Sequence, residues 1–140
     1  MLPEGTAGAA SGTIAGIPVT IRLAFNLTST GTANLSWVNP EPGTVLANVG
    51  YMVVGATGTG TVHIGRSSDG TGSASNWVSG GTLTGGLHAD EPGLGVVSQW
   101  LAIGPGGTGT NNSIVGQIGD TTASTMGGCF ALITFYRVGT

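Results

Sequence analysis

Apolar residues occupy every second position from Val19 to Leu27. Successive side chains of a β-strand point to opposite faces, so this pattern predicts a half-buried strand over residues 19–28. The chain also contains 28 glycines among its 140 residues, and each glycine costs a helix about 1 kcal/mol relative to alanine. Threonine, which is β-branched and loses side-chain freedom in a helix, is common as well. The sequence therefore favours strands and turns over helices.

Further segments have the same strand character and are separated by turns rich in glycine, proline and asparagine. We predict strands at residues 33–38, 44–55, 61–64, 96–103, 112–118 and 129–138. In the segment 44–55 every second residue from Val45 to Val53 shares one apolar face, and other apolar residues partly fill the opposite face, which suggests a central strand. The segment 129–138 is apolar on both faces, and we expect it to be buried on both. This series predicts an all-β fold, a two-sheet antiparallel β-sandwich of the jelly-roll type. We expect residues 19–140 to form this single domain, preceded by an extended N-terminal arm at residues 1–18.

Residues 65–95 are polar and rich in glycine, and we predict a long loop there. Loops of this length in a compact domain usually carry a function or an interface. Because tryptophan dominates interface hot spots, we expect Trp77 to be the anchor of a partner contact made by this loop. Trp37 and Trp100 fall within predicted strands, so we expect them to pack in the core or between subunits.

The chain is unusually poor in charge. It has no lysine, three arginines and a formal net charge of −3, and charged residues make up 6% of the sequence, against about 25% in an ordinary soluble domain. Free monomers rely on interspersed surface charge for solubility, so this composition favours a subunit that packs against neighbours. Three scattered arginines form no phosphate-binding cluster, so we expect no nucleic-acid partner. No segment approaches the roughly 20 apolar residues of a membrane-spanning helix, and the first 16 residues lack the regions of a signal peptide.

Few residues offer chemistry. The segment from His88 to Glu91 places His88, Asp90 and Glu91 together, and such donors could touch a metal or transfer protons. Pro92 and Gly93 follow, so we interpret the segment as an exposed turn. His63 is expected to be a hydrogen-bonded strand residue and Cys129 a small buried hydrophobe. We therefore predict no catalytic residues, no cofactor and no metal.

The arm at residues 1–18 has little to contribute to its own sandwich. Its large apolar residues are Leu2, Ile14 and Ile17, among glycine, alanine, serine and threonine. Segments of this composition are usually disordered unless something holds them. We predict that the arm docks on a neighbouring subunit. The candidate partner interface thus consists of Leu2, Ile14, Ile17, Trp77, His88, Asp90 and Glu91.

Two parts of the chain resemble a known family. Residues 48–55 read Asn-Val-Gly-Tyr-Met-Val-Val-Gly, and after a threonine- and glycine-rich turn residues 61–65 return as Thr-Val-His-Ile-Gly. A polar loop follows at residues 66–70, and the chain ends on the aromatic and apolar strand 131–138. This succession resembles the small jelly-roll proteins that decorate the heads of tailed bacteriophages. The likeness covers about the last two-thirds of the chain and is a pattern of strands and glycines.

The resemblance implies a decoration or cement protein on the outer surface of the virion. Such a protein binds the major capsid protein, is often a homotrimer, and stabilises the shell without catalysis. The alternative is another virion or surface module, such as a head fibre, a tail-tip module or a carbohydrate-binding β-sandwich. An exposed aromatic face would distinguish a carbohydrate-binding protein. An enzyme is the third class, and the residues supply no nucleophile with a base for it.

Overall fold

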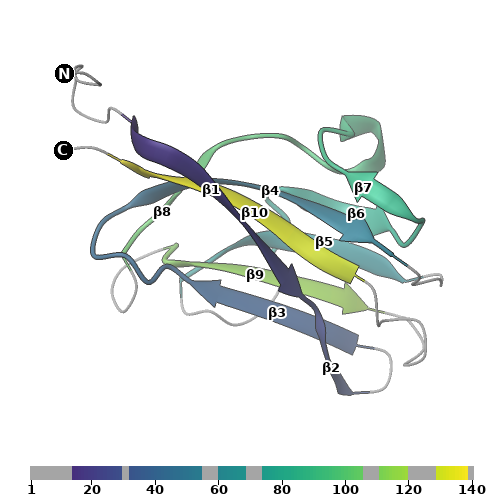
Figure 1. Cartoon of the computed structure of the whole chain (residues 1–140). Helices are drawn as coiled ribbons and strands as arrows, with labels where there is room; N and C mark the ends of the chain where they lie inside the picture. Colours follow the sequence, from purple (N-terminus) through teal and green to yellow (C-terminus); the bar gives the residue numbers. More distant parts are fainter. Residues whose placement is uncertain are drawn as a thin grey trace.

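The computed structural model describes residues 14–29, 32–54, 60–68, 74–105, 111–119 and 129–138. Almost all of the elements are strands (Figure 1). They are β1 (Ile14–Ala24), β2 (Asn26–Ser29), β3 (Thr32–Val38), β4 (Val45–Val53), β5 (Thr61–Ser67), β6 (Val78–Thr82), β7 (Gly86–His88), β8 (Leu101–Ile103), β9 (Ser113–Gly119) and β10 (Cys129–Val138). Within the described residues the helical element is one 3₁₀ turn, η1 (Pro92–Leu94).

The strands form two antiparallel sheets, which confirms the predicted β-sandwich. The first sheet has the order β1-β10-β4-β7, with β8 also pairing with β4, and the second has the order β2-β3-β9-β5-β6. The chain crosses between the sheets repeatedly, so that β10 lies between β1 and β4 while β9 lies between β3 and β5 (Figure 1).

Strand β4 shows how the sequence builds the core. Its residues Val45, Ala47, Val49, Tyr51 and Val53 are all buried, and the residues between them are partly exposed. The alternation expected for this segment is confirmed, as is its central position. In β10 the residues Cys129, Ala131 and Ile133 are buried, but the opposite face is only half-buried. The prediction that β10 is buried on both faces is therefore wrong: its outer side chains remain at the surface of the first sheet.

The segment 19–28 is not one strand. Strand β1 begins earlier, at Ile14, and pairs with β10, and the chain then passes at Phe25 into β2 of the second sheet. Phe25 is 6% exposed and its N–H donates to the Cys129 carbonyl oxygen at 3.2 Å. The apolar alternation gave no sign of this change of sheet, because Phe25 faces the same core after the bend as Leu23 does before it. The early start of β1 also means that residues 14–18 of the predicted arm belong to the sandwich, whereas Leu2 lies outside the described residues.

The predicted loop at residues 65–95 is largely wrong as well. It contains the end of β5, the strands β6 and β7, and η1. Glycine in these strands serves close packing: a Cβ placed on Gly81 would lie 2.5 Å from the hydroxyl oxygen of Tyr51 in the opposite sheet. A Cβ on Gly65 would lie 2.6 Å from the Ser75 backbone nitrogen, because residues 74 and 75 cross over β5 there. Gly65 and Gly81 are therefore sites where another part of the chain approaches closely, rather than signs of a loop.

Candidate functional site

Trp77 is a core residue, and its predicted role as an exposed interface anchor is wrong. The side chain is 0% exposed. Its indole N–H donates to the Gln99 carbonyl oxygen at 2.8 Å, and its backbone N–H donates to Ile64 at 3.0 Å. A buried indole needs an acceptor for its N–H, and Gln99 supplies it.

Trp100 has the opposite position. It is 43% exposed, and its ring packs against Tyr136 with a centroid separation of 4.9 Å. The predicted strand 96–103 is reduced to β8, at residues 101–103, so Trp100 lies just before the strand begins. In this segment, hydrogen bonds to side chains replace those of a strand ladder. Gln99 N donates to Asn48 Oδ1 at 3.3 Å, and the Trp77 indole N–H donates to the Gln99 carbonyl oxygen.

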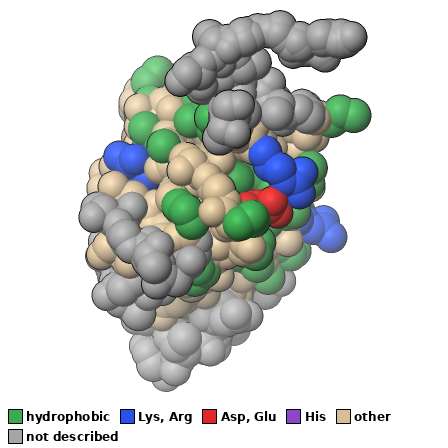
Figure 2. Space-filling view, turned by 90° about the vertical axis from the view of Figure 1, so that its left-hand side faces the viewer, with side chains coloured by type: hydrophobic (Ala, Val, Ile, Leu, Met, Phe, Trp, Pro, Cys, Tyr) green, Lys and Arg blue, Asp and Glu red, His purple; other side chains and the backbone are tan. Residues whose placement is uncertain are grey.

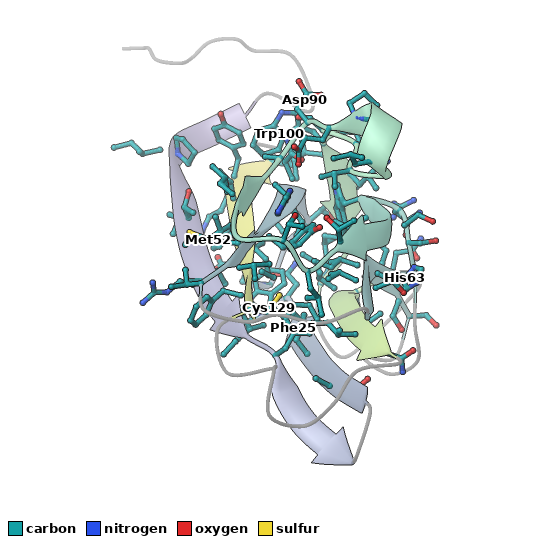
Figure 3. The ribbon with its side chains drawn as sticks, turned by 90° about the vertical axis from the view of Figure 1, so that its right-hand side faces the viewer. Phe25, Met52, His63, Asp90, Trp100 and Cys129 are labelled. Atoms are coloured by element: carbon teal, nitrogen blue, oxygen red, sulfur yellow. The ribbon has the colours of Figure 1, made fainter. Side chains whose placement is uncertain are left out.

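A hollow of ≈ 270 Å³ lies beside Trp100, on the outer face of the first sheet. Thr20, Thr134 and Asn48 are register neighbours across β1, β10 and β4, and all three line the hollow. Leu87, Asp90 and Trp100 also line it, and Figure 3 shows Asp90 and Trp100 near one another at one end of the molecule. We call these six residues the Trp100 pocket. Sequence reasoning missed this pocket, because the alternation over residues 96–103 gave no reason to separate Trp100 from the core.

The turn from His88 to Glu91 forms one side of the Trp100 pocket. His88 is 7% exposed, so its assignment to an exposed turn is wrong. Its ring stacks on Tyr51 with a centroid separation of 4.8 Å. Its Nδ1 lies 2.7 Å from Glu91 Oε1 and its Nε2 lies 2.8 Å from the Thr84 carbonyl oxygen, both within hydrogen-bond distance. Both ring nitrogens therefore face acceptors, and these contacts of the buried His88 ring hold the turn from His88 to Glu91 in place.

Asp90 remains exposed at the tip of this turn, as expected. Its backbone has φ 53, in the left-handed region that few residues other than glycine adopt. Aspartate and asparagine tolerate this region better than most side chains. No described residue donates a hydrogen bond to its carboxylate, so Asp90 presents free acceptors at the edge of the Trp100 pocket.

Burial shifts the acid–base behaviour of two groups under the first sheet. Removal from water raises the pKa of Tyr51 to about 12 and that of the Cys129 thiol to about 12. The Tyr51 hydroxyl also donates to the Thr82 carbonyl oxygen at 2.7 Å. Cys129 is 1% exposed, which confirms its role as a small buried hydrophobe. Both groups stay neutral at physiological pH.

The free edge of the first sheet is a second candidate surface. β1 is 11 residues long and pairs on one side with β10; on the other side no described strand covers it. Ile17 is 85% exposed and Val19 is 43% exposed. Val19 lies opposite Phe135, whose ring is 5.4 Å from that of Trp37. Phe135 and Trp37 themselves pack against the core. We call the exposed pair on β1, Ile17 and Val19, the apolar edge.

Charged groups are sparse on this molecule, as Figure 2 shows for one face. Arg137 forms a bidentate pair with Glu41, with Nε–Oε1 at 2.6 Å and Nη2–Oε2 at 3.2 Å. The hydrogen bond from Arg137 lowers the pKa of Glu41. Arg22 is placed over the Phe130 ring, 4.8 Å from its centroid. Arg66 Nη1 donates to the Ala102 carbonyl oxygen at 3.2 Å. All three arginines are thus engaged by neighbours within the chain.

The remaining chemistry is limited. His63 accepts a hydrogen bond at Nδ1 from Gly80 N at 3.3 Å, which confirms the prediction of a hydrogen-bonded strand residue. In the described part of the chain, no three His, Cys, Asp or Glu side chains gather closely enough to hold one metal ion. Those residues also contain no helix of the length and hydrophobicity needed to cross a membrane. Comparisons with protein-family models, curated proteins and solved structures give no match to this chain.

Proposed function

We propose that this protein is a structural subunit that decorates and stabilises the capsid of a tailed bacteriophage by binding its major capsid protein. The observation that carries the proposal is the apolar edge: a long edge strand with Ile17 85% exposed in a chain without lysine. Natural proteins protect edge strands with charge, lysine above all, or by covering them. Pro18 and the irregular register between Ala15 and Val19 protect part of this edge. A neighbouring subunit or the shell would cover the rest.

Decoration needs no catalysis. A protein that binds the assembled shell but not its free subunits stabilises the shell by RT ln(1 + [L]/Kd). Many copies on the outer surface of the virion would add their contributions. The resemblance to head decoration proteins supports a homotrimer, and the charge-poor surface supports an assembly of some kind.

Co-sedimentation with purified capsids tests this function. We expect the wild-type protein to sediment with capsids and Ile17→Lys to lose most of its occupancy, because the lysine places a charge on the edge. Leu94→Lys is the matched control, since Leu94 is an exposed leucine at 52% on η1, outside β1. Absence of co-sedimentation, or equal occupancy of the two variants, would contradict the proposal.

Analytical ultracentrifugation tests the assembly separately. The purified chain should sediment as a closed oligomer, with a trimer as the expected species. A soluble monomer at high concentration would count against the self-assembly part of the proposal, even if capsid binding were observed.

A further inference from the structure

We propose that the Trp100 pocket binds a neutral saccharide. A sugar ring has an apolar face of C–H groups and a rim of hydroxyl groups, so its binding site needs both an aromatic surface and hydrogen-bonding partners. The pocket has both: Trp100 is 43% exposed, and Thr20, Asn48, Asp90 and Thr134 line the hollow beside it. The proposal is independent of the capsid function, because it concerns a different surface from the apolar edge.

The size of the hollow limits the ligand. At ≈ 270 Å³ it falls just below the roughly 300–1,000 Å³ of sites that hold drug-sized molecules. One sugar ring, or the end of a longer chain, is the appropriate scale. The pocket is open to the surface, so the rest of an oligosaccharide can extend away from it.

The polar groups are arranged for hydroxyl recognition. Thr20 and Thr134 share a hydrogen bond at 3.0 Å, and Asn48 Nδ2 donates to Ser98 Oγ at 2.9 Å. Each hydroxyl keeps a further capacity to donate or accept. Within the described chain the Asp90 carboxylate and the Trp100 indole N–H have no hydrogen-bond partner, so both can bond to a ligand.

Charge selects a neutral ligand over an anionic one. Asp90 is the charged side chain among the described residues that line the pocket. The nearby Arg22 lies over the Phe130 ring instead. An acidic sugar or a phosphate would meet the Asp90 carboxylate without a compensating cation.

The pocket is also held in place before any ligand binds. Tyr136 packs against Trp100, and the Trp77 indole fixes the backbone of Gln99 beside it. The His88–Glu91 pair at 2.7 Å fixes the turn that presents Asp90. Preorganisation of this kind reduces the ordering cost of binding. A single ring held by these contacts should bind with Kd on the order of 1 mM, or about −4 kcal/mol.

Nuclear magnetic resonance of the ¹⁵N-labelled chain tests the site directly. Trp37, Trp77 and Trp100 each give one indole N–H signal, which single Trp→Phe variants assign. The probes are glucose, galactose, mannose and N-acetylglucosamine, with β-linked oligomers of each. We expect a saturable shift of the Trp100 signal with at least one probe and no change in the Trp77 signal.

Variants then locate the binding. Backbone amide signals of the residues that line the pocket report binding in variants without the Trp100 indole. By this measure Trp100→Ala should weaken binding by about tenfold or more, while an unchanged Trp77 signal shows that the fold is intact. Asp90→Asn preserves the tolerance for φ 53 and removes only the charge, so it should weaken binding severalfold. Leu94→Ala changes an exposed apolar residue outside the pocket and should leave the affinity unchanged.

Several outcomes would overturn the proposal. One is the absence of any saccharide-dependent shift at tens of millimolar. Another is a shift of the pocket's backbone amide signals that persists with unchanged affinity in Trp100→Ala. A third is tighter binding of N-acetylneuraminic acid than of neutral sugars. A Trp100 signal that responds to purified capsids but to no sugar would make the pocket a protein contact. That last result would leave the capsid function standing and sink only the saccharide assignment.

Discussion

Trp77 and Trp100 are the same type of residue and belong to neighbouring segments, yet one is buried in the core and the other lines a surface pocket. Trp77 is 0% exposed and Trp100 is 43% exposed. The Trp77 indole N–H donates to the Gln99 carbonyl oxygen at 2.8 Å, whereas the Trp100 indole N–H has no acceptor among the described residues. The buried tryptophan therefore fixes the backbone that carries the exposed one. The comparison teaches that the surface pocket depends on a core contact rather than on its own residues alone.

The backbone strengthens this dependence. Trp77 N donates to the Ile64 carbonyl oxygen in β5, and the Trp77 carbonyl oxygen accepts from Val97 N at 2.8 Å. Trp77 thus links the second sheet to the segment that leads to Trp100. Substitution of Trp77 should therefore disturb the Trp100 pocket, but substitution of Trp100 should not disturb the packing of the core.

The largest expected effect is that of Trp77→Ala. Removing a fully buried aromatic side chain should lower the free energy of unfolding by about 3–5 kcal/mol, because a cavity remains and the Gln99 carbonyl oxygen loses its donor. Urea denaturation monitored by circular dichroism measures the change. Trp77→Phe keeps most of the volume and should cost less. A Trp77→Ala variant as stable as the wild type would break the comparison at its first step.

The sequence predicted much of the framework that holds these residues. Every second residue from Val45 to Val53 is apolar, and the structure buries these residues. Such local periodicity is enough when one face of a strand meets the core. It failed for Trp77, because the surrounding Gly, Ser and Asn suggested a loop, whereas the reasons for those residues lie in distant partners. Gly81 is required by Tyr51, and Gly65 by the crossing of residues 74 and 75.

The candidate site was predicted less well than the fold. Trp100 was expected to pack in the core or between subunits because it falls within the predicted strand 96–103. The structure instead turns this segment out of the ladder, using Asn48 Oδ1 and the Trp77 indole as hydrogen-bond partners. Both partners are distant in sequence, so the pattern of residues within the segment could not predict these hydrogen bonds. Asp90 was included among the site residues from its neighbours in sequence, but its place beside Trp100 needed the structure.

The second prediction concerns alkaline pH and the buried side of the comparison. Tyr51 and Cys129 have pKa values raised from 10.0 and 9.0 to about 12 in the folded state. The unfolded chain therefore loses these protons first, so stability is fully present below pH 9 and is lost as the pH rises towards 12. We expect the free energy of unfolding to fall by about 2 kcal/mol by pH 10.

Urea denaturation across this range measures the decline. Cys129→Ser has no thiol and should remove the part of the decline that begins near pH 9, whatever its effect on stability at neutral pH. A flat profile up to pH 11 would show that these groups are more accessible to water than their burial indicates.

An effect smaller than that of Trp77→Ala is expected for His88→Ala, because His88 contacts both the buried Tyr51 and the turn that carries Asp90. The substitution removes the bonds to Glu91 and to the Thr84 carbonyl oxygen, together with the stacking on Tyr51. We expect a loss of about 1–3 kcal/mol in unfolding free energy. His88→Phe retains the stacking and separates it from the hydrogen bonds. If neither variant changes stability, the turn that carries Asp90 is not fixed by His88.

The smallest effect on stability should be that of Trp100→Ala. A side chain that is 43% exposed and packs chiefly on Tyr136 leaves no enclosed cavity when it is removed. We expect the free energy of unfolding to change by about 0.5 kcal/mol or less, as for most surface substitutions. Oxidation by N-bromosuccinimide supplies an independent measurement, since it should consume Trp100 in the native protein long before Trp77. If Trp100→Ala unfolded as readily as Trp77→Ala, the indole would be a core residue in solution. The assignment of Trp77 to the core and of Trp100 to ligand binding would then be wrong, because substituting a residue that serves only to contact a ligand should leave the fold intact.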